Sequence, residues 1–145
     1  MTMFMGEYRH NADAKGRIII PARFREELGD SIVCTKGLDG CITIYTMEQW
    51  ASILEGLKKL PNTKKESRMY IHMVTARAAQ CDFDVQGRIL LPAPLIEEAM
   101  IEKECVVIGV ADHVEIWSKV RWDEYYSKAS LSFEDVAEQL TEFVK

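Results

Sequence analysis

The sequence lacks the features of a membrane or secreted protein. Its apolar runs have the length of strands, and none approaches the ~18 residues that a membrane-spanning helix needs. Its N-terminus has neither the charged start nor the long apolar stretch of a signal peptide. We therefore expect a cytoplasmic protein.

Metal-binding and nucleophilic patterns are also missing. No two cysteines form a Cys-x-x-Cys pair, and the glycines form neither a phosphate-binding loop nor a nucleophile elbow. A zinc site would need clustered ligands at short spacing, so buried thiols in a reducing compartment are the preferred interpretation. We expect no cofactor. The scattered candidates are Cys34, Cys41, Cys81, Cys105, His10, His72 and His113.

The formal net charge of −5 over 145 residues is unevenly distributed. Residues 97–145 carry 12 acidic and 5 basic side chains, whereas residues 1–96 carry 13 basic and 11 acidic ones. Phosphate binding depends on the local patch rather than on the balance of the whole chain. An acidic chain of this kind therefore remains a candidate for nucleic-acid binding.

Two basic clusters stand out. Between residues 8 and 25 only Asp13 opposes five bases, whereas residues 58–68 carry five bases and Glu66. We interpret the second cluster as the solvated face of a helix. The bases are Arg9, Lys15, Arg17, Arg23 and Arg25 in the first, and Lys58, Lys59, Lys64, Lys65 and Arg68 in the second.

A ten-residue stretch occurs twice. The sequence DAKGRIIIPA at 13–22 returns as DVQGRILLPA at 84–93, a spacing of 84 − 13 = 71 residues, close to half the chain. Similarity continues on both sides of the motif, which indicates an internal duplication. Each half is therefore predicted to contain, in order, a strand, a turn, a strand, a short helix, a strand, a turn, a strand and a helix.

The length suits one domain or two small halves around a shared core. We expect a first repeat at 1–60, a connecting helix at 61–79 and a second repeat with C-terminal helices at 80–145. The last helix should be capped by Ser132, with its apolar stripe packed on this chain or a neighbouring subunit. Other expected elements are strands at 3–8, 17–20, 32–35, 41–45 and 81–83, a helix at 22–28, and helices capped by Thr46 and Ser118.

The repeated motif has both a structural and a functional interpretation. An aspartate can accept a hydrogen bond from the backbone two residues on, and glycine tolerates positive φ, so both kinds of residue suit a tight turn. We assign that role to Asp13, Gly16, Asp84 and Gly87. Each turn is followed directly by an arginine, Arg17 or Arg88, whose fork suits phosphate oxygens or a guanine edge.

An enzymatic interpretation would pair Asp13 with Asp84 as two carboxylates in a shared cleft. Neither aspartate has a neighbouring Ser, Thr or His that would complete a catalytic arrangement. Each is followed four residues later by an arginine that would neutralise it. We therefore predict that the chain is not an enzyme, and that both carboxylates hold the turns.

The double Asp-x-x-x-Arg signature resembles that of the MraZ family of bacterial transcriptional regulators. Supporting segments are MFMGEY at 3–8, KGR at 15–17, GLD at 37–39, KECVVIG at 103–109 and EIWS at 115–118, so the likeness covers nearly the whole chain. One departure is that Met1 and Thr2 precede the methionine at which such proteins usually begin.

The resemblance implies an α+β fold with a mainly β core, namely a duplicated swapped-hairpin β-barrel of the AbrB type with helices outside. It also implies a homo-oligomeric ring, with an octamer favoured. Such proteins bind direct repeats of double-stranded DNA upstream of their own operon, the division and cell-wall gene cluster, and are therefore associated with the nucleoid.

In such proteins the Asp-x-x-x-Arg loops form the DNA-binding face. Lys15, Arg17 and Arg88 match those positions, and Arg9 belongs to the adjoining basic stretch. Gln86 replaces Lys15 in the second copy, which predicts a weaker phosphate contact there and a donor for a base edge.

A different class of function remains open. An antitoxin-like module would use its helical tail to hold a partner protein, and that tail would be disordered without the partner. The capping patterns and amphipathic faces instead favour folded helices.

Overall fold

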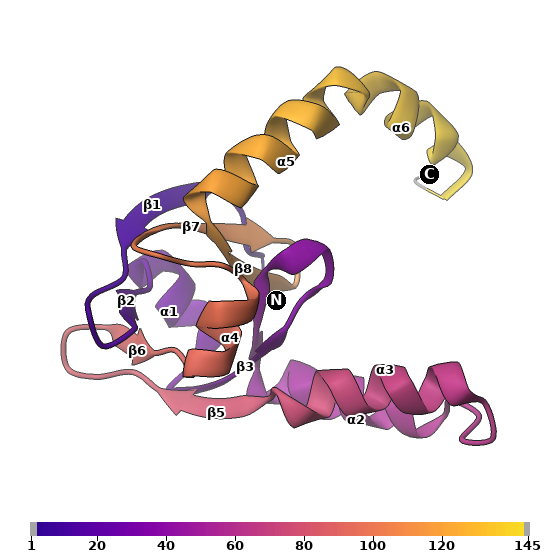
Figure 1. Ribbon diagram of the computed structural model, residues 1–145, viewed down its shortest axis with the longest axis horizontal. Helices are drawn as coiled ribbons and strands as arrows, with labels where there is room; N and C mark the ends of the chain where they lie inside the picture. Colours follow the sequence, from indigo (N-terminus) through magenta and orange to yellow (C-terminus); the bar gives the residue numbers. More distant parts are fainter. Residues whose placement is uncertain (1–2, 144–145) are drawn as a thin grey trace.

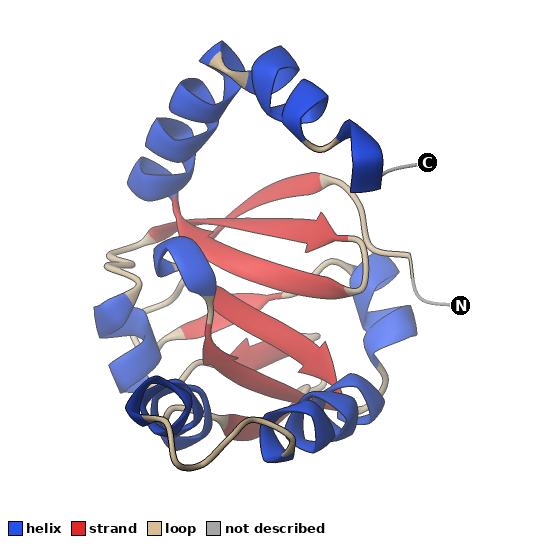
Figure 2. Cartoon of the chain, turned by 90° about the vertical axis from the view of Figure 1, so that its right-hand side faces the viewer, coloured by secondary structure: helices blue, strands red, loops and turns tan. Residues whose placement is uncertain are grey.

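The computed structural model describes residues 3–143, so Met1 and Thr2 lie outside the described residues. A β-sheet core is surrounded by helices (Figures 1 and 2). The strands are β1 Glu7–Asn11, β2 Arg17–Ile19, β3 Ser31–Lys36, β4 Ile42–Thr46, β5 Ala79–Asp82, β6 Arg88–Leu90, β7 Glu104–Val110 and β8 His113–Ser118. The helices are α1 Ala22–Leu28, α2 Met47–Lys58, α3 Lys65–Ala76, α4 Ala93–Glu98, α5 Lys119–Leu131 and α6 Phe133–Gln139.

The two halves of the chain share one antiparallel sheet, in the order β1-β7-β8-β4-β3-β5. The first strand of each half pairs with the other half, since β1 lies on β7 and β5 lies on β3. A second sheet consists of β2 and β6 alone, again one strand from each half. The predicted α+β fold with a mainly β core is confirmed, and its strands are exchanged between the repeats.

The repeated motif supplies the centre of the core. Ile18 and Ile89 are opposite each other in the β2–β6 ribbon and are almost fully buried. A proline follows each of these strands and precedes a short helix, where its missing N–H costs nothing. These helices then bury large side chains, Phe24 and Leu28 from α1 and Leu95 from α4. Each ten-residue motif thus provides both a turn and, through Ile18 or Ile89, part of the core.

The β2–β6 ribbon relates the two copies by an approximate two-fold axis. Exchanging each residue with its counterpart 71 positions away reproduces the same strand register. The pairs are Arg17 with Leu90, Ile18 with Ile89, and Ile19 with Arg88. The flanking hydrogen bonds are equally matched, with Ile20 N to Gly87 O at 3.1 Å and Leu91 N to Gly16 O at 3.0 Å.

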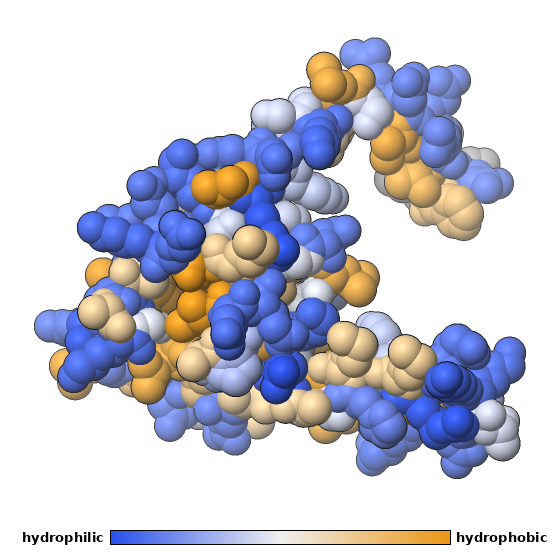
Figure 3. Space-filling view, viewed as in Figure 1, coloured by the Kyte–Doolittle hydropathy of each residue, from blue (hydrophilic) through white to orange (hydrophobic). Residues whose placement is uncertain are grey.

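Two helical arms extend from the sheet. The α2–α3 hairpin forms one arm and α5 with α6 forms the other (Figure 1), and the space-filling view shows open space between them (Figure 3). Thr46 caps α2 with the predicted capping box, because its side chain accepts from Gln49 N and the Gln49 side chain accepts from Thr46 N. Ser118 caps α5 by accepting from Arg121 N at 3.1 Å.

Ser132 occupies the predicted N-cap position of α6, but its side chain makes no capping hydrogen bond. Its backbone is not extended, and its hydroxyl contacts the carbonyl of Ala129 at 3.5 Å, because α5 continues almost directly into α6. The apolar stripe of this last helix is also not packed on the rest of the described chain. Its exposed members in and just after α6 are Phe133, Val136, Leu140 and Phe143.

Three smaller expectations also differ from the structure. The first strand begins at Glu7 instead of residue 3, because Gly6 has a φ of 103° and Phe4 makes only an isolated bridge to Ala111. This strand continues through Asn11, and its counterpart β5 starts at Ala79 instead of residue 81. Among the four free thiols, Cys81 is only half-buried, since it lies on the edge strand.

Candidate nucleic-acid interface

Both Asp-x-x-x-Arg loops lie at one end of the molecule. The β1–β2 loop and the β5–β6 loop extend toward the left edge of Figure 1. The antiparallel β2–β6 pairing holds them together, and Arg88 Nη1 lies 3.8 Å from Asp13 Oδ2 across the two copies. Two segments 71 residues apart in sequence therefore form one surface, which we call the loop face (residues 13–17 and 84–88).

The first loop is braced by the carboxylate of Asp13. One oxygen, Oδ1, accepts from the backbone N–H groups of Lys15 and Arg17, both at 2.9 Å. The other, Oδ2, accepts from Arg17 Nε at 2.6 Å. Gly16 completes the turn with a φ of 86° and donates its N–H to Asp13 O at 3.0 Å. This carboxylate therefore fixes both the turn and the arginine stem.

The second loop repeats this geometry. Asp84 Oδ1 accepts from the backbone N–H groups of Gln86 and Arg88 at 2.9 Å each, and its Oδ2 accepts from Arg88 Nε at 2.8 Å. Gly87 has a φ of 77°. Equivalent residues of the two loops thus occupy equivalent places on the backbone.

The same hydrogen bonds change the acidity of the carboxyl groups. The pKa of Asp13 falls to about 2, chiefly because the backbone N–H of Arg17 donates to the carboxylate, with further lowering by the Arg17 side chain. The pKa of Asp84 is lowered for the same reason, first by the backbone N–H of Arg88. Both groups are ionised near neutral pH and already hold donors, which suits a structural role.

Cationic groups remain available on the loop face. Arg17 is half-buried, and within residues 3–143 its only side-chain hydrogen bond uses Nε, leaving the outer guanidinium nitrogens for a ligand. Lys15 is exposed and forms no ion pair with any described residue. Gln86 is exposed at the corresponding place of the second loop.

Arg9, the remaining residue of the predicted set, lies in β1 opposite Val106. Its guanidinium contacts Glu7 at 3.0 Å and Asp123 of α5 at 2.9 Å. These two carboxylates raise the pKa of Arg9, with the hydrogen bond to Asp123 as the largest cause. Two carboxylates therefore balance the charge of Arg9, whereas Lys15 has no ion-pair partner among the described residues.

Sequence patterns did not reveal the position of Arg25. Its Nη1 donates to Ile20 O at 2.5 Å, and the guanidinium occupies the space where a Cβ on Gly87 would lie. A residue of the first half therefore packs against the loop of the second half. Its place in the basic stretch was visible in the sequence, but its partner depends on the strand exchange.

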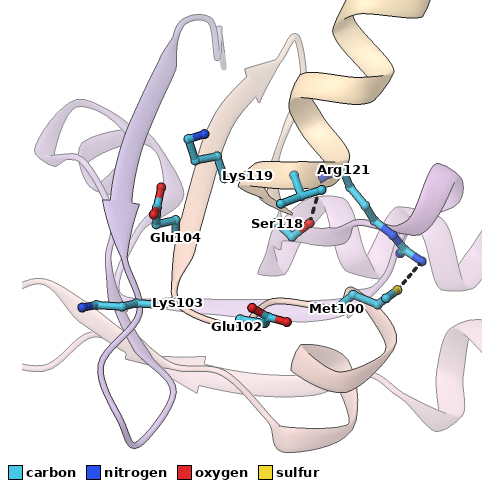
Figure 4. Close-up of a pocket in the computed structure, with 8 residues that line it drawn as sticks. Met100, Glu102, Lys103, Glu104, Ser118, Lys119 and Arg121 are labelled. Atoms are coloured by element: carbon cyan, nitrogen blue, oxygen red, sulfur yellow. Dashed lines mark hydrogen bonds between the residues drawn. The ribbon is translucent and has the colours of Figure 1, made fainter.

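A separate cavity of about 300 Å³ lies where β7 and α5 begin, as Figure 4 shows. Within it Arg121 serves the fold, because its Nη1 donates to Gly40 O at 2.9 Å and Glu98 O at 3.2 Å. Across the described part of the chain, no three His, Cys, Asp or Glu side chains are grouped as a metal site would require. The cavity lining is Met100, Glu102, Lys103, Glu104, Ser118, Lys119, Val120 and Arg121.

Replacing Asp13 tests its bracing role. A carboxyl group with a depressed folded-state pKa contributes stability above its ordinary pKa near 3.8, and this contribution is lost as the pH falls through about 2. We expect wild type to be more stable than Asp13→Asn at pH 7, with the difference narrowing between about pH 4 and 2. Chemical denaturation at several pH values measures this.

Asp13→Leu serves as the harsher variant, since leucine accepts no hydrogen bond. It should disorder the loop, seen as faster amide exchange at Lys15 and Arg17, while Asp13→Asn retains an acceptor oxygen and part of the order. A difference between wild type and Asp13→Asn that stays constant from pH 7 to 2 would contradict the proposed bracing.

Comparison with known proteins identifies the family. The family model described as "MraZ protein, putative antitoxin-like" matches twice, at residues 3–72 and 74–144. A protein named transcriptional regulator MraZ from Thermoanaerobacter sp. (strain X514) is 54% identical over 138 residues, covering 95% of this chain and 96% of the relative. A protein of the same name from Ligilactobacillus salivarius is 49% identical over 141 residues, covering 97% of this chain and 99% of the relative.

No helix within residues 3–143 is both long and apolar enough to cross a membrane.

The duplicated motif, the sheet shared by both halves and the double match all agree with one assignment. The chain is a member of the MraZ family, whose relatives carry the name transcriptional regulator.

Proposed function

We propose that this protein is a sequence-specific DNA-binding regulator that acts in the cytoplasm at the nucleoid, without cofactor or catalysis. Its targets are direct repeats in the promoter of its own operon, the division and cell-wall gene cluster. The observation that carries this proposal is the loop face, where two carboxylate-braced arginine loops lie together. The name of the relatives as transcriptional regulators supports it.

The braced loops suit DNA because their backbone and arginine stems are ordered before binding. An arginine whose Nε is already held loses less conformational freedom when its outer nitrogens meet a base or phosphate. In this proposal Arg17 and Arg88 read base edges, Lys15 contacts phosphate, and Gln86 meets a base edge. Arg9 contributes only a weaker, long-range attraction, since Glu7 and Asp123 balance its charge.

Assembly into a ring is the second part of the proposal, and the two arms support it. The α5–α6 arm carries, in its α6 part, exposed apolar side chains among four acids, Glu134, Asp135, Glu138 and Glu142. The α2–α3 arm carries the basic residues at 58–68 and an exposed apolar strip on α3, formed by Met69, Tyr70 and Met73. Figure 3 shows apolar surface on both arms beside the open space between them.

Opposite charges and exposed apolar surface favour docking of the α5–α6 arm of one subunit on the α2–α3 arm of the next. Such a contact joins two different surfaces, and a repeated contact of this kind closes into a ring when the rotation permits. We favour eight subunits. Every subunit then presents its loop face in the same sense.

The ring predicts the arrangement of the operator. DNA that follows such a face meets one loop pair after another in a constant direction, so the operator should consist of direct repeats. Their period should be about one helical turn, 10–10.5 bp, so that each copy presents the same groove. Inserting half a turn between repeats should weaken binding strongly, and a full turn should weaken it less. A footprint over a single inverted repeat would contradict the ring mechanism.

Gel-shift titration with the DNA upstream of the chain's own gene tests the proposal. We expect a shift that survives excess unrelated duplex. Absence of any shift at low salt would remove the proposal and favour the antitoxin-like alternative, which agrees with the description of the family as antitoxin-like. That alternative predicts binding of a partner protein through the α5–α6 tail instead.

A further inference from the structure

The two loops of the loop face share a backbone geometry but differ in their side chains. The Asp carboxylates accept from the same relative positions in both, so Ala14 corresponds to Val85 and Lys15 to Gln86. The first loop presents a methyl group and a charge. The second presents a branched apolar side chain and an uncharged amide.

Val85 is the most exposed large apolar side chain in the described part of the chain, at 104% relative exposure. It contacts no core, so folding does not account for an apolar residue at this tip. A single exposed valine is unremarkable on an ordinary surface. Here, however, it directly precedes Gln86 and lies in the same braced turn as Arg88.

The chemistry of this tip matches one kind of base pair. In the major groove only thymine presents a methyl group, which apolar side chains contact, and the adenine edge suits an amide such as that of Gln86. The tip of the first loop, with Ala14 and Lys15, has less apolar surface and suits phosphate instead.

We propose that Val85 contacts the C5-methyl group of a thymine, so that the second loop reads an A·T pair. This inference rests on the proposed DNA-binding function, and it also bears on the orientation in which a protomer binds its repeat. The approximate two-fold axis of the β2–β6 ribbon relates the two loops of one protomer. If these loops had identical side chains, the protomer would recognise the same base sequence in either orientation. Unlike loops remove that symmetry, and each protomer then binds its repeat in one orientation.

Replacing thymine by deoxyuridine removes only the methyl group and tests this contact. A series of duplexes with the upstream sequence is prepared. In each duplex, deoxyuridine replaces thymine at one position of every repeat, and the replaced position differs from one duplex to the next. We expect wild type to lose about three- to five-fold in affinity per repeat at one position, the value of one buried methyl group. Val85→Ala should bind unmodified DNA more weakly and should be insensitive to the replacement at that position.

Val120→Ala is the matched control, because Val120 is an exposed valine on α5, away from the loop face. It should retain the full sensitivity to deoxyuridine. Thermal unfolding should be unchanged in Val85→Ala, since the side chain packs on nothing. Wild type that is indifferent at every thymine, or Val85→Ala that remains equally sensitive, would overturn the proposed contact while leaving DNA binding intact. Failure of every duplex to bind would instead remove the proposed function itself.

Discussion

Arg17→Ala is expected to abolish specific DNA binding while the protein stays folded. The side chain lies on the loop face, and its only side-chain partner among residues 3–143 is Asp13, at 2.6 Å. An arginine that reads a base contributes about 1–3 kcal/mol at each site. A ring that engages several repeats at once multiplies the loss, so the apparent affinity should fall by orders of magnitude. Gel shifts against specific and unrelated duplexes measure the change.

Lys15→Ala provides the comparison from the same loop. A phosphate contact carries no sequence information, so this variant should weaken binding to all duplexes alike and lower the salt slope by about one unit. Thermal unfolding of both variants checks the fold. Normal binding of the repeats by Arg17→Ala would assign the whole motif to the turn structure and leave DNA binding to another surface.

Charged substitutions in α6 are expected to break the ring into smaller species. Phe133 and Leu140 are exposed, so Phe133→Glu with Leu140→Glu should leave the subunit folded. In the proposed contact Phe133 and Leu140 meet the apolar strip of α3, so a glutamate at either position would lose its hydration against apolar side chains and would oppose docking. Light scattering coupled to size exclusion should show the smaller species. Loss of multivalent binding should weaken the operator complex by about 10²–10⁴-fold.

A charge-exchange pair is the control for this second expectation. Reversing Lys58, Lys59 and Lys64 to glutamate should also impair assembly, because both arms would then be acidic. Adding Glu134→Lys and Glu138→Lys should restore part of it. A complex of unchanged mass after the α6 substitutions would show that these arms do not join the subunits.

The loops could be predicted from the sequence to a large extent because their interactions are local. An aspartate, a glycine and an arginine within five residues form hydrogen bonds across at most four positions, and the proline that follows starts the short helix. The capping box at Thr46 is local in the same way. Such elements depend little on the rest of the chain.

Other expectations depended on distant residues. The Ser132 cap did not form because α5 nearly continues into α6, a feature set by the path of the arm rather than by the Ser-x-x-Asp pattern. Arg9 belongs to a basic stretch in sequence, yet the fold places Asp123 of α5 beside it at 2.9 Å. Charge counts along the chain could not include that partner.

The sequence by itself determined the duplication, the two braced turns and the residues that each turn exposes, because hydrogen bonds within a few residues and positive φ at glycine specify them. Only the tertiary structure decided that the two turns form one face. The pairing of β2 with β6 joins strands 71 residues apart, and such pairing depends on the burial of Ile18 against Ile89 in a common core. The exposure of the α6 stripe was decided there too, since no other described element of the subunit covers it.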